Sequence, residues 1–233
     1  MPSQRRPSAA SPRLAAAFLL NTVLLSTALL LPASPAGAAS WFTKGPQKGE
    51  QVEFTGIVSD NSGQPLEGVT VVLEATRDRF RMRSMSREVE DTFRISTTTD
   101  AQGGYTLKWS WNDFHNGFAL LVGTPLRQMG KDLLYVLHKV DVTKRAKQGG
   151  PVITPMVVED TTFLLNLRRF LASLKTDDER RTYQEIGRPD KIDAAPVAGA
   201  TETAWWYFEA GRVYRFRSGT LDRVDTFDPV KAP

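Results

Sequence analysis

Residues 52–73 read VEFTGIVSDNSGQPLEGVTVVL, and this stretch decides the fold class of the chain. Apolar residues alternate with polar ones over 52–58, which is the period of a strand with one buried face. A turn of Asp, Asn, Ser and Gly follows at 60–63, and such side chains stabilise tight turns. Alternation resumes over 69–73 after a Pro/Gly corner. The stretch therefore predicts two short strands joined by a corner.

A third strand is predicted after the turn at 100–104, because large apolar residues again alternate with polar ones. The residues on its apolar face are Tyr105, Leu107, Trp109 and Trp111. Exposed indoles can stack on sugars, so Trp109 and Trp111 also allow a polysaccharide-binding module. A face of four large apolar side chains normally points into a core, and we expect both indoles to be buried.

Three of these segments carry a resemblance to a known family. FTGIVSD at 54–60, GQPLEGVTV at 63–71 and TTDAQGGYTL at 98–107 resemble the carboxypeptidase regulatory-like family in their spacing and glycines. The resemblance implies a transthyretin-like β-sandwich of seven strands over residues 51–158. It also implies a module that is itself non-catalytic and commonly accompanies another domain.

The rest of this domain has a looser pattern. It is predicted to contain strands at 118–122, 133–142 and 151–158, a break at 123–125, and a polar, basic connection at 144–150.

A bridging helix is predicted over residues 159–175, where apolar side chains recur at helical spacing. Thr176 and the three acidic residues after it form a capping box that begins a second helix, which ends at Gly187. An aromatic-rich antiparallel meander of about three strands follows, and completes a small α+β domain over 176–233. This domain is weakly similar to small outer-membrane assembly lipoproteins of the SmpA/OmlA type, whose lipid-bearing cysteine is missing here.

Two groups of residues are candidates for binding a partner. One is a ridge of arginines at period two, which an extended chain would place on one face: Arg77, Arg79, Arg81 and Arg83. A ridge of this kind suits an acidic protein or an anionic polymer. The alternative is a solvated edge strand, in which the arginines prevent edge-to-edge pairing with another sheet. Nearby acidic residues would then offset much of the electric field of the arginines. The other group is Trp205 and Trp206, which must point to opposite faces of a strand and could equally form a small two-sided core.

The N-terminus has the pattern of an export signal. Basic residues precede an apolar run over 14–31, and Ala36-Gly37-Ala38 supplies the small-x-small motif of a cleavage site. We expect a signal peptide at 1–38, a polar linker at 39–50, and a protein that is periplasmic or secreted. The membrane is then contacted only transiently, and the alternative is an uncleaved anchor.

Charge and cysteine content narrow the possible functions. The formal charge of +4 falls to +1 when three arginines leave with the signal, so nucleic acid is not an expected partner. The chain has no cysteine, which excludes disulfides and thiolate catalysis.

No catalytic, cofactor or metal-binding residues are predicted. His115 and His138 are the only histidines, and neither belongs to a zinc motif. The C-terminal Tyr-Arg-Gly-Ser of the transthyretin-like hydroxyisourate hydrolases is also missing. We expect His115 to be a solvated loop residue. The sequence therefore predicts a non-enzymatic binding or accessory protein of the cell envelope that contacts another envelope protein. A polysaccharide-binding module and an accessory domain of an envelope hydrolase are the alternatives.

Overall fold

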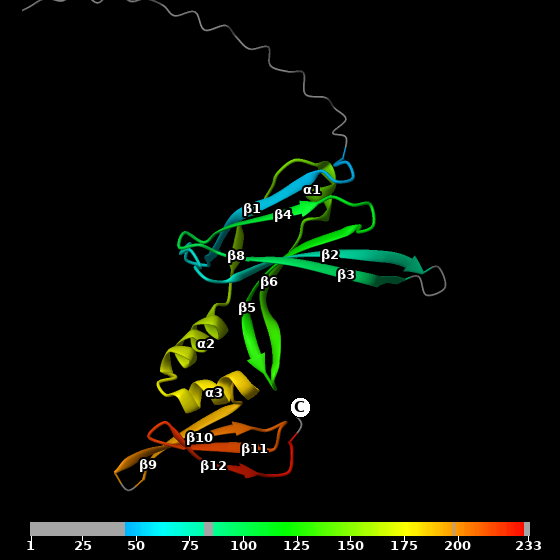
Figure 1. The fold of residues 1–233 in the computed structure, drawn as a ribbon. Coiled ribbons are helices and arrows are strands. Elements are labelled where there is room, and N and C mark those ends of the chain that lie inside the picture. The colour runs from blue at the N-terminus through cyan, green and yellow to red at the C-terminus, as the bar shows by residue number, and fades with distance from the viewer. Residues whose placement is uncertain (1–44, 82–85, 198, 231–233) are drawn as a thin grey trace, which may run out of the picture. The chain divides into compact units, whose positions relative to one another are not determined.

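The computed structural model describes residues 45–81, 86–197 and 199–230, and this part of the chain is mainly β. Its strands form three hydrogen-bonded sheets, and three helices connect them (Figure 1). The predicted signal at 1–38 lies outside the described residues. None of the helices that the structure describes has the length and hydrophobicity needed to span a bilayer.

The first sheet is built around β1 (Gln51–Asp60). This strand pairs antiparallel with β4 (Gly104–Ser110) and parallel with two short strands, β7 (Val152–Ile153) and β8 (Met156–Val158). Side chains of β1 and β4 are buried and exposed largely in turn. The half-buried strands predicted from alternation at these positions are confirmed.

Between β7 and β8 the chain continues alongside β1 and approaches it very closely. A Cβ added to Gly56 would lie 2.2 Å from the carbonyl oxygen of Thr154, so only glycine fits there. The Tyr105 hydroxyl donates to the same carbonyl oxygen at 2.7 Å, and burial raises the pKa of this phenol to about 12. Thr154 thus joins the two short strands to the core.

The second sheet has the order β3-β2-β5-β6. Its strands are β2 (Thr70–Arg81), β3 (Ser86–Thr98), β5 (Gly117–Gln128) and β6 (Lys131–Asp141). β2 and β3 form one long hairpin, so the strand after the turn at 100–104 is the fourth and not the third. Sequence reasoning missed β3 as a strand.

The break predicted at 123–125 is wrong, because β5 runs through it. A bulge between Val122 and Gly123 absorbs the irregularity, and a Cβ on Gly123 would lie 2.6 Å from the Tyr135 carbonyl oxygen. β2 pairs with β5 only as far as Gly123. Pro125, which lacks an N–H, therefore falls where β5 has no partner on that side.

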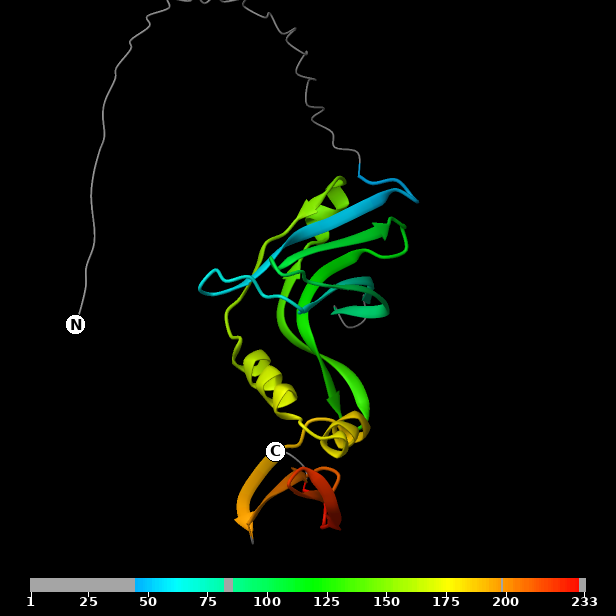
Figure 2. The same ribbon diagram turned by 60° about the vertical axis from the view of Figure 1, so that its left-hand side comes forward.

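These two sheets pack face to face through one hydrophobic core (Figure 2). Strands β1 and β4 supply one face of this core, and β2 and β5 supply the other. Trp109 and Trp111 lie in it at 6% and 8% exposure, as predicted. Their buried rings are not accessible for stacking on sugars.

The polar connection predicted at 144–150 is instead a short helix, α1 (Thr143–Gln148). Its sequence is rich in good helix formers. Ala146 is its buried contact with the core.

Two longer helices follow, α2 (Thr162–Ser173) and α3 (Asp177–Ile186). Both were predicted from apolar spacing or capping. The predicted capping box is confirmed, because the Thr176 hydroxyl accepts from the Glu179 backbone and the Glu179 carboxylate accepts from the Thr176 backbone.

The C-terminal sheet contains four strands and not three. In order across the sheet they are β12 (Thr220–Thr226), β11 (Arg212–Arg217), β10 (Ala200–Tyr207) and β9 (Lys191–Val197). The sequence prediction missed β9. One face of this sheet packs on α2 and α3 through a second core, which includes Leu167, Phe170, Ile186, Trp205, Tyr207, Tyr214 and Phe216.

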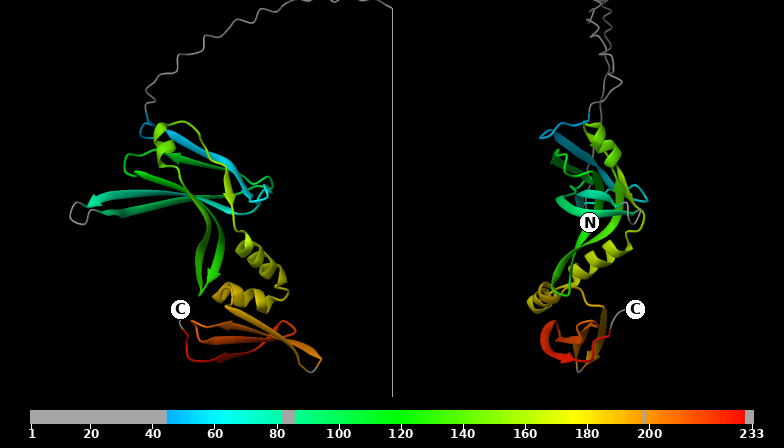
Figure 3. Two further views of the ribbon diagram at one scale, coloured as in Figure 1. Left: turned by 180° about the vertical axis from the view of Figure 1, so that it is seen from behind. Right: turned by 90° about the vertical axis from the view of Figure 1, so that its right-hand side faces the viewer.

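The β5–β6 hairpin connects the two cores. It extends from the second sheet to α3 (Figures 1 and 3), and Leu126 on β5 is a member of the second core. The Arg127 carbonyl oxygen accepts from the Arg188 backbone at 3.0 Å. The Arg127 side chain donates to the Gln184 carbonyl oxygen at 2.9 Å.

Candidate functional site

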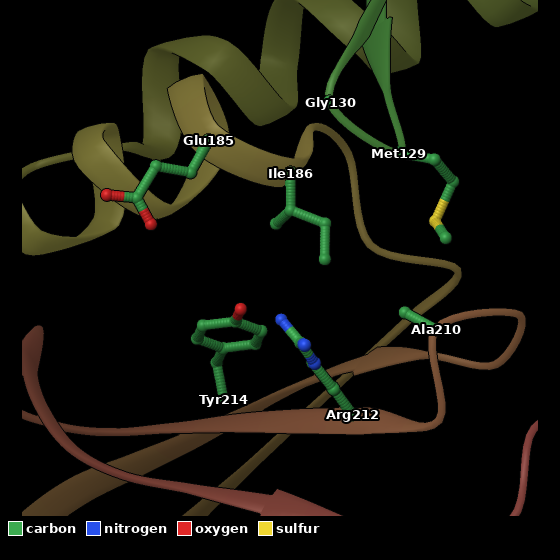
Figure 4. Close-up of a pocket in the computed structure, with 7 residues that line it drawn as sticks. All are labelled: Met129, Gly130, Glu185, Ile186, Ala210, Arg212 and Tyr214. Atoms are coloured by element: carbon green, nitrogen blue, oxygen red, sulfur yellow. The ribbon is translucent and has the colours of Figure 1, made fainter.

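The tip of the β5–β6 hairpin borders a pocket of about 380 Å³, which we call the tip pocket (Figure 4). Three segments that are distant in the sequence line it: the hairpin turn, the end of α3 and the start of β11. The lining residues are Met129, Gly130, Glu185, Ile186, Ala210, Arg212 and Tyr214.

The turn at the tip has an unusual residue. Met129 and Gly130 form a two-residue loop between paired strands, with φ values of 50° and 73°. This conformation belongs to the primed turns, which prefer Asn-Gly because both central residues need positive φ. A methionine is strained in this position, and its side chain, 37% exposed, overhangs the pocket.

The opposite wall carries the polar groups. Figure 4 shows the Arg212 guanidinium and the Tyr214 hydroxyl directed into the same space, with the carboxylate of Glu185 turned away from Arg212. Among the described residues, none forms an ion pair or hydrogen bond with the Arg212 side chain. The pocket thus contains an available cation and a phenol hydroxyl beside an apolar wall.

Sequence reasoning did not single out this pocket. Its residues become neighbours only when the hairpin docks on α3, and β5 was predicted to end before the tip. The one local signal was Met129-Gly130 between two apolar runs, since a hairpin there places a non-glycine residue at positive φ.

The structure places part of the predicted arginine ridge on the β2–β3 hairpin. Arg77 and Arg79 both contact Glu90, at 3.3 Å and 3.1 Å. The hydrogen bond from Arg79 is the main reason that the pKa of Glu90 is held below its usual value. Arg81 ends β2, with a side chain that is not described, and Arg83 lies outside the described residues.

Arg77 contacts one exposed aromatic ring, and a second exposed ring lies on the other side of His115. The Arg77 guanidinium is 4.3 Å from the ring centroid of Phe114, which is 48% exposed. Phe93 on β3 is 50% exposed and packs its ring against Trp109. We call Arg77, Arg79, Phe93 and Phe114 the arginine surface.

His115 adjoins this surface and is not the solvated loop residue that was predicted. It is 9% exposed, with Nε2 3.0 Å from an Asp91 carboxylate oxygen and Nδ1 3.0 Å from the Asn112 side-chain oxygen. The Asn112 oxygen also accepts from two backbone N–H groups, which fixes it as an acceptor. The prediction failed because Asp91 comes from β3, the strand that the sequence did not indicate.

Trp205 and Trp206 lie on opposite faces of β10, as their adjacency requires. Trp205 is 3% exposed and packs against Phe170 and Phe216 in the second core. Trp206 is half-buried on the other face, beside Phe208 and Phe227. The structure therefore does not bring these two residues together with the arginines.

In the described part of the chain, no three histidine, aspartate or glutamate side chains are grouped closely enough to hold a metal ion. Comparison with protein-family models and with curated proteins found no match.

Solved structures show distant similarity. A 9R-lipoxygenase from Cyanothece PCC8801 aligns over 46% of this chain and 16% of its own, with 10% identity and a TM-score of 0.30. The dioxygenase domain of a dioxygenase carbohydrate-binding protein fusion from Streptomyces sp. SirexAA-E aligns over 55% of this chain and 97% of its own, with 13% identity and a TM-score of 0.30. At these scores neither similarity supports an argument about fold or function.

Proposed function

We propose that this chain is an exported, non-enzymatic binding protein of the cell envelope, which contacts another envelope protein through the arginine surface. The basic, apolar and small-x-small pattern of residues 1–38 supports export. The partner should present an acidic rim around an apolar centre.

We also propose that residues 51–158 form a transthyretin-like sandwich of the carboxypeptidase regulatory-like kind. If β7 and β8 are the two halves of one interrupted edge strand, the two facing sheets contain seven strands. The interruption at Thr154 and the resemblance of 54–60, 63–71 and 98–107 support this assignment. The α+β part at 176–233 is proposed as a second small unit, whose core also includes side chains of α2 and Leu126 of β5.

The observation that carries the function is an exposed cluster in which Phe114 contacts Arg77, Glu90 binds both Arg77 and Arg79, and His115 contacts both Phe114 and Phe93. Aromatic residues and arginine are enriched in protein interfaces, and tryptophan, tyrosine and arginine are enriched among the few residues that carry most of the binding energy. The rings of Phe93 and Phe114 also pack against the buried ring of His115, with ring centroids at most 6.4 Å apart. A surface prepared in this way loses little side-chain entropy on binding.

The test is affinity capture from envelope extracts with quantitative mass spectrometry. Phe114→Ser and Arg79→Glu should each weaken capture of the partner by about tenfold or more, as expected for an interface residue of this kind. Ile153→Ser is the matched control, because Ile153 is 65% exposed on β7 and is not part of the arginine surface. If all four proteins capture the same set in equal amounts, the proposal is wrong.

A further inference from the structure

We propose that the tip pocket binds a small monocarboxylate that carries a short apolar body. The ligand's carboxylate accepts hydrogen bonds from the Arg212 guanidinium and the Tyr214 hydroxyl, and its apolar body packs against Ile186 and Met129. These groups face one space in Figure 4. The site is distinct from the arginine surface, so this proposal does not depend on the proposed function.

The guanidinium is available to a ligand. The side chain of Arg212 has no partner among the described residues. Arg215 on the same strand, by contrast, forms ion pairs with Glu202 and Asp225. A guanidinium presents several N–H donors in a planar fork that matches a carboxylate. Tyr214 is only 9% exposed, and its ring packs edge-on against Tyr207, which fixes the direction of its hydroxyl.

The strained turn indicates that the Met129 side chain has a role. The left-handed backbone at Met129 would be relieved by asparagine or glycine. Strain of this kind is concentrated at sites that bind ligands. A methionine side chain adapts its shape to apolar groups, and Met129 together with Ile186 gives the pocket a wall suited to a short alkyl chain.

Glu185 explains why a monocarboxylate is the expected ligand. Its exposed carboxylate lines the same pocket, so the charge of Arg212 is offset nearby. A dianion such as phosphate would be attracted by the Arg212 guanidinium and repelled by the Glu185 carboxylate. An anion with a single charge, placed against Arg212 and away from Glu185, avoids much of that repulsion.

The test is a titration of the full chain with isocaproate, followed by NMR of methyl-labelled methionine. The Met129 methyl resonance should shift and saturate. Isocaproamide, which has the same apolar body without the charge, and inorganic phosphate should leave it unchanged at equal concentration. The proposal is wrong if isocaproate causes no shift up to about 10 mM, a range that covers the weak binding expected of so small a ligand. It is also wrong if phosphate or the amide binds as well.

Variants locate the site. Arg212→Gln should weaken isocaproate binding by at least about tenfold, and Tyr214→Phe by a smaller factor. Arg217→Gln is the matched control, since Arg217 is exposed at the other end of β11. Equal binding by Arg212→Gln and wild type would overturn the proposal.

Met129→Asn separates ligand binding from stability. Asparagine suits the turn, so this variant should melt at a higher temperature than wild type while binding isocaproate more weakly. If it binds isocaproate as tightly as wild type does, Met129 is not part of the site.

Discussion

Glu74 is a buried acid on the outer face of β2, at 7% exposure. One of its carboxylate oxygens accepts from Lys139 at 2.9 Å, and the other accepts from Arg94 at 2.5 Å and 2.9 Å. Burial alone would raise the pKa of Glu74, but these charged hydrogen bonds outweigh it and hold the pKa below its ordinary value. The side chain links β3, β2 and β6 across the sheet.

Glu74→Gln should lower the free energy of unfolding by about 1 to 2 kcal/mol at neutral pH, because it removes charged hydrogen bonds. A lowered folded-state pKa means that this contribution is present above the unfolded value of 4.5 and is lost as the pH falls through the folded value. Urea unfolding of both proteins at neutral and acidic pH measures the difference. A gap that stays constant with pH would contradict this account of Glu74.

At the scale of elements, Gly187 sets how closely the β5–β6 hairpin approaches the end of α3. A Cβ at this residue would lie 2.0 Å from the Arg127 carbonyl oxygen, and its φ is 101°. Two constraints therefore act at once, since the backbone is in a conformation that favours glycine and the neighbouring strand leaves no room. The Tyr207 hydroxyl, from the C-terminal sheet, donates to the Gly187 carbonyl oxygen at 2.8 Å. This hydrogen bond also holds the backbone of Gly187 in position.

Gly187→Ala should destabilise the protein by about 3 kcal/mol or more, because the hairpin must move away from α3. Gly63→Ala is the control that measures the cost of placing a residue with a Cβ at a positive φ. Gly63 has a similar positive φ of 83° with nothing within 4 Å of an added Cβ, so its cost should be about 1 kcal/mol. Thermal or urea unfolding compares the two. Equal losses would show that close packing at Gly187 contributes nothing.

Elements with a clear period were predictable, and elements with a mixed signal were not. β1, β4 and α2 have apolar residues at the spacing of their structure, and the structure contains all three. β3 is rich in charged residues, and its apolar Phe93 is 50% exposed. Its sequence therefore does not alternate clearly between apolar and polar residues. β5 seemed to end at Gly123 because a bulge and a break look the same in sequence.

At the scale of the whole molecule, neither candidate surface could be assembled from the sequence. Period two correctly placed Arg77 and Arg79 on one side of a strand. It could not show that Glu90 binds both of them or that Phe114 lies beneath Arg77. The tip pocket depends on tertiary docking of Met129 against the segment near Arg212, which no local pattern encodes.

The export proposal predicts the mature N-terminus. Produced in a host that exports it, the protein should have the intact mass of residues 39–233, which mass spectrometry measures. Ala38→Phe should block processing, because the peptidase pocket accepts only a small residue there. Ala39→Ser, just after the predicted cleavage, should be processed as wild type. A wild-type protein that keeps its first 38 residues would favour the membrane-anchor alternative instead.

Because Leu126 packs among residues of α2, α3 and the C-terminal sheet, the protein does not divide cleanly at residue 158. A fragment truncated there would keep the whole hairpin but lose Phe163, which stacks on Tyr135 at 3.6 Å, together with the cover over Leu126. Leu126 and the face of Tyr135 that Phe163 covers would then be exposed to water, and the fragment would be prone to self-association. Anyone dissecting the chain should shorten the hairpin as well, closing it with an Asn-Gly turn near the bulge at Gly123.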